Sequence, residues 1–149
     1  MMGRISETVK AGGGEIIGVI PSALLAREVG RHDIGDLRVV RSMHERKAMM
    51  VDLSDGFIAL PGGFGTFEEF CEIVTWAQLG LHAKPVGLLN VDQYFDPLIE
   101  QFNRAVVQEF ASAENRNLIL HETNPDRLLD MMESYKPPNV ERWIDSDEA

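Results

Sequence analysis

Short runs of apolar residues, mostly β-branched or aliphatic, recur along this chain. They occupy residues 15–20, 37–40, 56–60, 85–89 and 117–120. Runs of this length and composition are typical of strands that are buried on both faces of a parallel sheet. Segments with helical periodicity separate them, and this alternation predicts βαβ units. We therefore expect an α/β fold built around a parallel sheet.

The predicted helices have recognisable starts. Ser42 and Glu45 have the Ser-x-x-Glu spacing of a capping box, and Thr66 and Glu69 have the equivalent Thr-x-x-Glu spacing. Such side chains bind backbone groups that have no partner inside the helix. The predicted helices cover residues 4–11, 43–53, 67–79, roughly 95–111, and 125–134.

Composition and charge narrow the class of protein. The chain has 149 residues, 44% hydrophobic and 26% charged, which suits one globular domain over residues 1–149 with a frayed tail from about residue 136. Acidic residues outnumber basic ones by 24 to 14, so the net charge is −10. This charge repels nucleic acids and anionic membranes. No apolar run reaches the roughly 20 residues that span a bilayer, so we expect neither kind of partner.

Cys71 is the only cysteine, which excludes a disulfide within the chain and a multi-cysteine metal site. A single cysteine fits a reducing compartment, and we expect a cytoplasmic protein. Phe67, Phe70, Cys71 and Val74 follow the spacing i, i+3, i+4, i+7 within one predicted helix. This spacing predicts that Cys71 is a small core residue rather than a reactive thiol.

The segment Pro61–Thr66 carries the clearest chemical signal. It places three glycines, Gly62, Gly63 and Gly65, between an apolar strand and a helix start. Glycines let backbone N–H groups approach a ligand closely, a helix N-terminus carries partial positive charge, and Thr66 adds a hydroxyl. The alternative is a tight strand-to-helix turn. Three glycines together with the threonine favour a phosphate-binding loop.

Glu69 has two interpretations. The capping box already explains a glutamate three residues after Thr66, and on local physics alone capping is the simpler role. A carboxylate one helical turn from a bound phosphate is also placed to reach the ribose and glycosidic carbon of a nucleotide. One side chain cannot fill both roles completely, and both stay open at this point.

A second candidate group lies in the predicted helix 43–53. Met43, Arg46, Lys47 and Met50 share one helix face, so the two basic residues are flanked by methionines. An isolated basic pair is usually solvated and balanced by neighbouring carboxylates. The methionine flanks instead favour a half-buried guanidinium that serves a ligand.

The histidines indicate no metal centre. His32, His44, His82 and His121 show none of the spacings by which histidines and carboxylates bind a metal. His82 lies with Trp76 near the end of the helix that follows the glycine loop. The two residues either line a base pocket or pack against their neighbours, and packing is the commoner role of an aromatic residue at a helix end.

Two segments resemble one known family. Residues 43–50 resemble its Met-His-x-Arg-Lys-x-x-Met signature, and residues 61–69 resemble its Pro-Gly-Gly-x-Gly-Thr-x-x-Glu signature. This is the LOG (Lonely Guy) family of cytokinin riboside 5′-monophosphate phosphoribohydrolases, often labelled "possible lysine decarboxylase". The resemblance extends over residues 1–129. It implies a Rossmann-like fold, that is, a doubly wound parallel sheet.

The resemblance also implies an activity. Members hydrolyse the N-glycosidic bond of adenine-type nucleoside 5′-monophosphates, releasing the base and ribose 5-phosphate, and they require no cofactor. Lysine decarboxylation ordinarily needs pyridoxal phosphate on a Schiff-base lysine, and no lysine here has a recognisable site around it. The implied catalytic pair is Arg46 and Glu69. The implied phosphate and nucleotide contacts are Gly62, Gly63, Gly65, Thr66, Met43 and Lys47.

The chain departs from the family pattern in two places. Members usually begin with a strand, a Ser/Gly-rich loop, a helix and a second strand, so we expect an N-terminally shortened version of the fold. Such shortening exposes a sheet edge, and because family members are typically homodimers we expect a homodimer here. Gln108-Glu109-Phe110 replaces the family's Glu-Gly-Phe at a helix end. A nonhydrolytic nucleotide or cofactor carrier is the alternative function.

Overall fold

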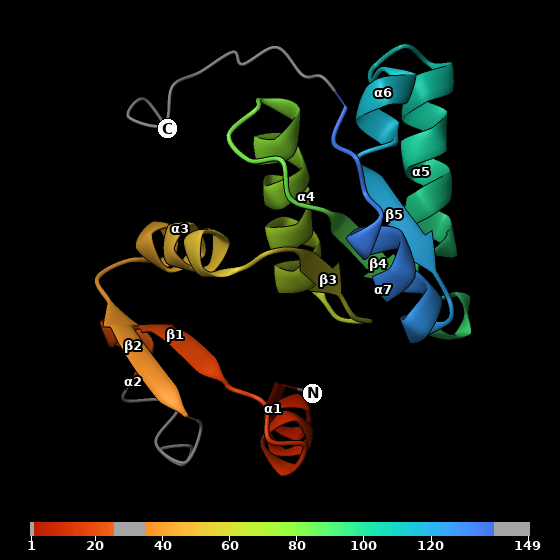
Figure 1. Ribbon diagram of the computed structural model, residues 1–149. Coiled ribbons are helices and arrows are strands. Elements are labelled where there is room, and N and C mark those ends of the chain that lie inside the picture. The colour runs from red at the N-terminus through yellow and green to blue at the C-terminus, as the bar shows by residue number, and fades with distance from the viewer. Residues whose placement is uncertain (1, 26–34, 139–149) are drawn as a thin grey trace. The chain divides into compact units, whose positions relative to one another are not determined.

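The computed structural model describes residues 2–25 and 35–138, which form two compact units divided after Ser54 (Figure 1). All its strand pairs are parallel, and helices alternate with the strands. The protein therefore has the predicted α/β class, with its parallel strands in two sheets, and is consistent with a Rossmann-like fold. The assignment of residues 1–149 to a single domain stays a prediction, and the predicted frayed tail lies outside the described residues after residue 138.

The first unit contains a two-stranded parallel sheet. Its strands pair in register from Ile17 with Asp36 to Pro21 with Val40. The helix that follows them packs against both strands and contributes the buried Val51. The elements of this unit are α1 (Met2–Ala11), β1 (Ile17–Pro21), α2 (Ser22–Leu25), β2 (Asp36–Val40) and α3 (Met43–Leu53).

The second unit contains a three-stranded parallel sheet in the order β3-β4-β5. Its strands are β3 (Phe57–Ala59), β4 (Val86–Leu89) and β5 (Ile119–Glu122). Its helices are α4 (Phe64–Gln78), the 3₁₀ turn η1 (Val91–Gln93), α5 (Asp96–Val107), α6 (Ala113–Arg116) and α7 (Pro125–Glu133).

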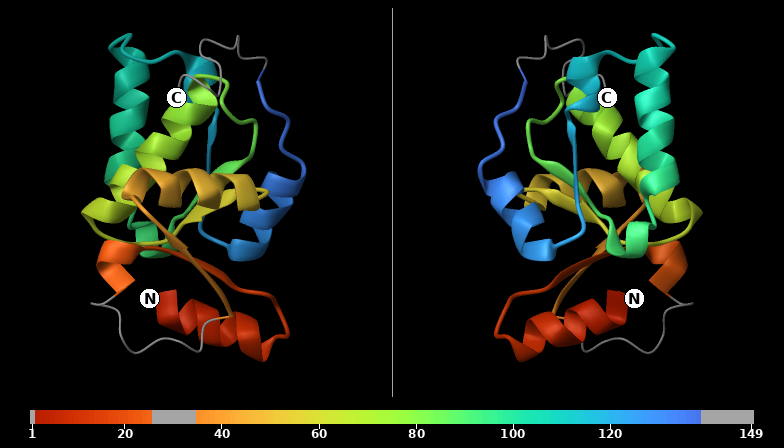
Figure 2. Two further views of the ribbon diagram at one scale, coloured as in Figure 1. Left: turned by 90° about the vertical axis from the view of Figure 1, so that its left-hand side faces the viewer. Right: turned by 90° about the vertical axis from the view of Figure 1, so that its right-hand side faces the viewer.

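Helices cover both faces of this sheet. Val86 and Leu88 on β4 belong to one buried cluster with Phe70 of α4 and Ile99 of α5. Because side chains alternate along a strand, the intervening Gly87 faces the other way. There it meets α7, whose fully buried Leu128 would lie 3.0 Å from a Cβ atom at position 87. Figure 2 shows α4 and α5 on one side of the strands and α7 on the other.

The pattern of apolar runs predicts these elements well. All five predicted strands are present within about two residues, and α3 has the predicted bounds. The 95–111 prediction is too long, because α5 ends at Val107 and a turn follows. The short elements α2, η1 and α6 were not predicted. Within the described residues, no helix is both long and apolar enough to cross a membrane.

Two predictions for α4 are wrong. The helix begins at Phe64 with Gly63 as its N-cap residue, three residues before the predicted start, so Thr66 and Glu69 do not form a capping box. Cys71 is exposed rather than buried. The buried side of α4 instead runs through Phe70 and Ala77. Partial desolvation nevertheless raises the pKa of the Cys71 thiol, which favours its neutral form.

Candidate functional site

The glycine loop joins β3 to α4 in the second unit. It therefore lies at the carboxyl end of a parallel strand, where open α/β sheets bind their ligands. The carbonyl of Gly63 accepts hydrogen bonds from the N–H groups of Thr66 (3.0 Å) and Phe67 (3.2 Å), which closes the first turn. Phe64 and Gly65 are the first two residues of α4, and N–H groups at these positions have no acceptor within the helix, so they are available to an anion.

The three glycines of this loop differ in the space around their Cα atoms. None has a positive φ angle, so backbone conformation does not require them. A Cβ atom on Gly62 would collide with the Thr66 hydroxyl, so a close contact requires this glycine. At Gly63 and Gly65, by contrast, an added Cβ would meet no heavy atom of another described residue within 4 Å. These two positions leave room for a ligand to approach the backbone.

The true start of α4 changes the interpretation of Glu69. This residue lies a full turn inside the helix, so a capping role no longer explains it. It is four positions after Gly65 and therefore on the same helix face. Its side chain is half-buried. A carboxylate thus stands one turn along the helix from the open backbone at Gly65.

A second loop touches the glycine loop, and sequence reasoning did not identify it. The Tyr94 hydroxyl, after β4, donates a hydrogen bond of 2.5 Å to the carbonyl of Gly62. Buried Asn90 shapes this second loop by accepting a hydrogen bond from the N–H of Phe95 at 2.7 Å. The sequence could have pointed to this loop only through its two predicted strands, 56–60 and 85–89. If these strands are parallel neighbours, as β3 and β4 are, the loops that follow them lie at the same edge of the sheet.

The basic candidates lie on α3 in the first unit. The helix start has the predicted cap, because the Ser42 hydroxyl accepts a hydrogen bond from the N–H of Glu45 at 3.1 Å. The Glu45 carboxylate accepts hydrogen bonds from the backbone N–H of Arg41 (2.8 Å) and from its guanidinium (3.3 Å). These bonds, the backbone one most strongly, hold the pKa of the Glu45 carboxyl below its usual value. Glu45 therefore stabilises the first turn of α3.

The four residues of the predicted α3 face differ in exposure. Met43 and Met50 are exposed, whereas Arg46 and Lys47 are half-buried. This confirms the half-buried guanidinium, and its service to a ligand stays a prediction. Arg46 belongs to the unit that ends at Ser54 and Glu69 to the unit that begins at Asp55, so their pairing also stays a prediction.

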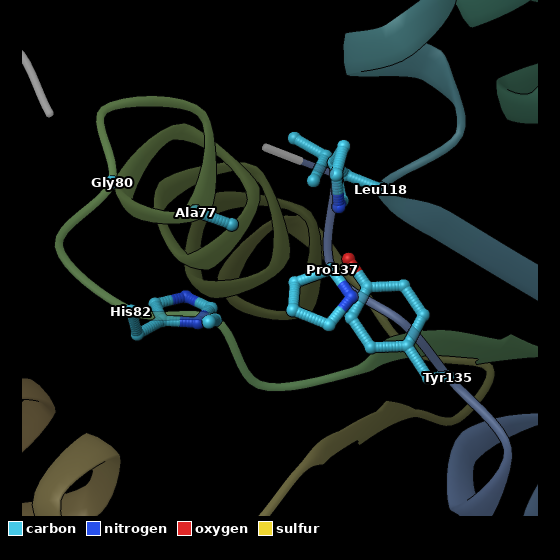
Figure 3. A pocket seen from close by; sticks show the side chains of 8 residues that line it. Ala77, Gly80, His82, Leu118, Tyr135 and Pro137 are labelled. Carbon is cyan, nitrogen blue, oxygen red and sulfur yellow. The ribbon is translucent and has the colours of Figure 1, made fainter. Parts of the chain in front are cut away.

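A cavity of about 150 Å³ lies at the far end of α4 (Figure 3). His82 lines it together with Tyr135, but α4 has 15 residues and is therefore about 22 Å long, so the cavity is remote from the glycine loop. A base attached to a phosphate on the loop would not reach this cavity, which favours packing as the role of His82, and the base-pocket interpretation of Trp76 and His82 stays a prediction.

The hydrogen bonds of His82 indicate a structural role. The N–H of Lys84 donates to Nδ1 at 3.2 Å, so in the neutral ring Nε2 carries the proton and donates to the Ile73 carbonyl at 2.9 Å. Burial lowers the pKa of His82. Among the described residues, no cluster of three or more His, Cys, Asp or Glu side chains could hold a metal ion, and His32 lies outside them.

Comparisons with known proteins identify relatives over most of the chain. A family model described as "Possible lysine decarboxylase" matches residues 2–132. The chain is 47% identical over 137 residues to the Arabidopsis thaliana "cytokinin riboside 5'-monophosphate phosphoribohydrolase LOG2". It is 48% identical over 137 residues to the Oryza sativa subsp. japonica "probable cytokinin riboside 5'-monophosphate phosphoribohydrolase LOGL6". Both matches cover 92% of this chain, which spans 64% of the Arabidopsis protein and 55% of the rice protein.

Proposed function

The chain belongs to the possible lysine decarboxylase family, which includes the LOG proteins, and from this premise we propose that it is a nucleotide hydrolase. Its substrates are adenine-type nucleoside 5′-monophosphates, including cytokinin ribosides. It hydrolyses their N-glycosidic bond and releases the free base and ribose 5-phosphate. The names of the relatives support this reaction rather than a decarboxylation.

The open space at Gly63 and Gly65 is the observation that carries this proposal. Neither backbone conformation nor a neighbouring atom requires glycine at these positions. A phosphate fits there, because the first-turn N–H groups of α4 and the helix dipole both favour an anion. Thr66 and Gly62 complete the loop. A 5′-phosphate bound here would direct the attached ribose along α4 toward Glu69.

The chemistry then needs a carboxylate and a cation. Cleavage of the glycosidic bond develops positive charge at C1′, which the Glu69 carboxylate would stabilise while it orients the ribose hydroxyls or the attacking water. The bonding electrons leave with the base nitrogen, the water oxygen bonds to C1′, and the proton that this water loses is taken up by the departing base. Arg46 would bind the nucleotide and balance charge on the departing base. Met43 and Lys47 would flank the nucleotide.

The test is base release from two substrates. The protein is incubated with AMP and with isopentenyladenosine monophosphate, and free base is followed by chromatography. We expect release that falls to background in a Glu69→Ala variant and persists in a Glu68→Ala variant, which truncates the neighbouring exposed glutamate. No release above the Glu69→Ala background contradicts the proposal. Calorimetric binding with intact nucleotide recovered afterwards identifies a carrier instead.

We also propose that the protein is a cytoplasmic homodimer. Within residues 2–25 and 35–54, the sheet of the first unit consists of β1 and β2 alone, so each strand is hydrogen-bonded on one side only, and Ile17, Leu37 and Val39 on these strands are exposed. An open strand edge is a template for pairing with another chain, and exposed apolar surface marks interaction sites. A monomer mass by light scattering at micromolar concentration contradicts self-association.

A further inference from the structure

One hydrogen bond joins the loops that follow β3 and β4. The Tyr94 hydroxyl donates to the carbonyl oxygen of Gly62 at 2.5 Å, although the two residues are 32 positions apart in sequence. The distance is at the short end for an O–H···O bond. Both residues belong to the second unit. This contact therefore ties the glycine loop to the neighbouring strand-end loop.

The geometry of the peptide group makes this contact relevant to anion binding. The described residues contain no cis peptide bond, so the peptide that joins Gly62 to Gly63 is trans and planar. In a trans peptide, the C=O of one residue and the N–H of the next point in opposite directions. A bond that holds the Gly62 carbonyl therefore also sets the direction of the Gly63 N–H. Without such an anchor, consecutive glycines sample many orientations.

The loop that carries Tyr94 is itself firmly held. The Tyr94 ring packs edge-on against the buried Phe95 ring, with centroids 5.1 Å apart and an interplanar angle of 84°. Asp92 and Gln93, just before Tyr94, have φ angles of 51° and 61°, which non-glycine residues rarely adopt. Residues held in such conformations cluster at functional sites. The backbone here accepts strain where it presents the tyrosine.

We propose that Tyr94 is a positioning residue for the phosphate loop. By holding the Gly62 carbonyl, it keeps the Gly63 N–H in the orientation that binds the 5′-phosphate. Tyr94 acts through Gly62 and takes no part in bond cleavage. This inference rests on the proposed function, because it assigns the ligand of the loop as the phosphate of the substrate.

The variant Tyr94→Phe tests the proposal, because it removes only the hydroxyl from a side chain that is 47% exposed. We expect KM for AMP to rise about three- to tenfold, the effect of one hydrogen bond, while kcat stays within about twofold, the signature of lost uniform binding. Tyr135→Phe is the matched control, since Tyr135 is the only other tyrosine and lines the remote cavity. It should leave both constants unchanged.

A second measurement separates positioning from general loosening. The measurement is amide NMR on protein whose glycines carry an NMR-active nitrogen isotope. Without ligand, the Tyr94→Phe substitution should change the amide chemical shift of Gly63 and leave that of Gly87 in the core unchanged. Added AMP should shift Gly63 in the wild type at a lower concentration than in the variant. The folding equilibrium constant of the variant should fall by no more than about tenfold, the effect of a single hydrogen bond, and a larger loss would indicate general loosening.

The outcomes separate this proposal from the proposed function. Base release by the wild type with an unchanged KM in Tyr94→Phe overturns the role of Tyr94 and leaves the hydrolase standing. Weaker AMP binding by Tyr94→Phe, in a wild type that binds AMP without cleaving it, supports Tyr94 and overturns the hydrolase. A wild type that neither binds nor cleaves AMP overturns both.

Discussion

The hydroxyl of Thr66 occupies the space that a Cβ atom on Gly62 would need. Gly62 is thus a packing glycine, whereas Gly63 and Gly65 border open space. One motif therefore combines a position that the fold requires with positions that a ligand would explain. Substitutions by alanine distinguish the two kinds, because a methyl group is enough to fill either space.

Gly65→Ala should separate binding from stability. The residue lies in the first turn of α4, where alanine is a better helix former than glycine, so we expect unchanged or higher thermal stability. The added methyl group fills the space that we assign to the phosphate. KM for AMP should therefore rise at least about tenfold, because the phosphate loses its direct contacts with backbone amides. Thermal unfolding and steady-state kinetics on the same sample provide the check.

Gly62→Ala is the counterpart of this variant. Its methyl group is forced against Thr66, so the protein should lose about 1–3 kcal/mol of unfolding free energy, as overpacked sites do.

For the Gly65→Ala variant, a wild-type KM would show that no ligand occupies the open space at position 65.

Glu69→Gln should reduce turnover without reducing stability. The amide has almost the same shape as the carboxylate but carries no charge to stabilise the cation that develops at C1′. We expect kcat to fall at least about a hundredfold, in line with other catalytic carboxylates. Glu68→Gln, one position away and exposed, is the matched control and should keep wild-type kcat. Equal activity of the two variants would remove Glu69 from the mechanism.

Local patterns predict elements better than they predict contacts. The bounds of α3 follow from Ser42, whose hydroxyl can satisfy only nearby backbone groups, and the structure confirms them. The same reasoning misplaces the start of α4, because Gly63 can begin a helix without a side-chain cap and Thr66 packs against Gly62 instead. Capping motifs are thus reliable only where no earlier residue can start the helix.

Helical periodicity has a similar limit. It identifies the apolar face of α4 but not its centre, and one position, about 100° around the helix, separates buried Phe70 from exposed Cys71. No local sequence pattern could have predicted the contact of Tyr94 with Gly62, because the two residues are 32 positions apart. It depends on which strands are neighbours, and this is set by the register of Phe57 with Val86.

Glu109→Gly should stabilise the protein. Gln108 is the C-cap of α5, and Glu109 follows it with a φ angle of 62°. The N–H of Glu109 bonds to the Val106 carbonyl (3.0 Å) and that of Phe110 to the Ala105 carbonyl (2.8 Å), which is the Schellman motif that favours glycine at position 109.

Replacement by glycine removes a strain of about 1–2 kcal/mol, and the melting temperature should rise by roughly 2–8 °C, because each kcal/mol is worth about 2–4 °C for a chain of this size. Glu109→Ala retains the Cβ atom and controls for loss of the charge. If the two variants melt at the same temperature, the left-handed conformation is not the source of strain. Position 109 is also where the sequence departs from the Glu-Gly-Phe segment of the family that it resembles.

His82 should make stability depend on pH in the mildly acidic range. Burial is the main cause that lowers its pKa below 6.5, and the charge of Lys84 adds to it, while the hydrogen bond to the Ile73 carbonyl opposes the shift. Protonation would also turn Nδ1 from an acceptor into a donor facing the N–H of Lys84, only 3.2 Å away. His82 therefore binds a proton less readily in the folded state than in the unfolded chain.

The sign of the effect follows from proton uptake. Below pH 6.5 the unfolded state binds more protons at this site than the folded state, so unfolding free energy decreases as the pH falls. His82→Gln, measured by urea unfolding from about pH 7 to about pH 5, should lose less stability over this range than the wild type. His121→Gln, at an exposed position on β5, should keep the wild-type slope. Equal slopes in all three proteins would mean that His82 has the same pKa in the folded and unfolded states, and would contradict the prediction.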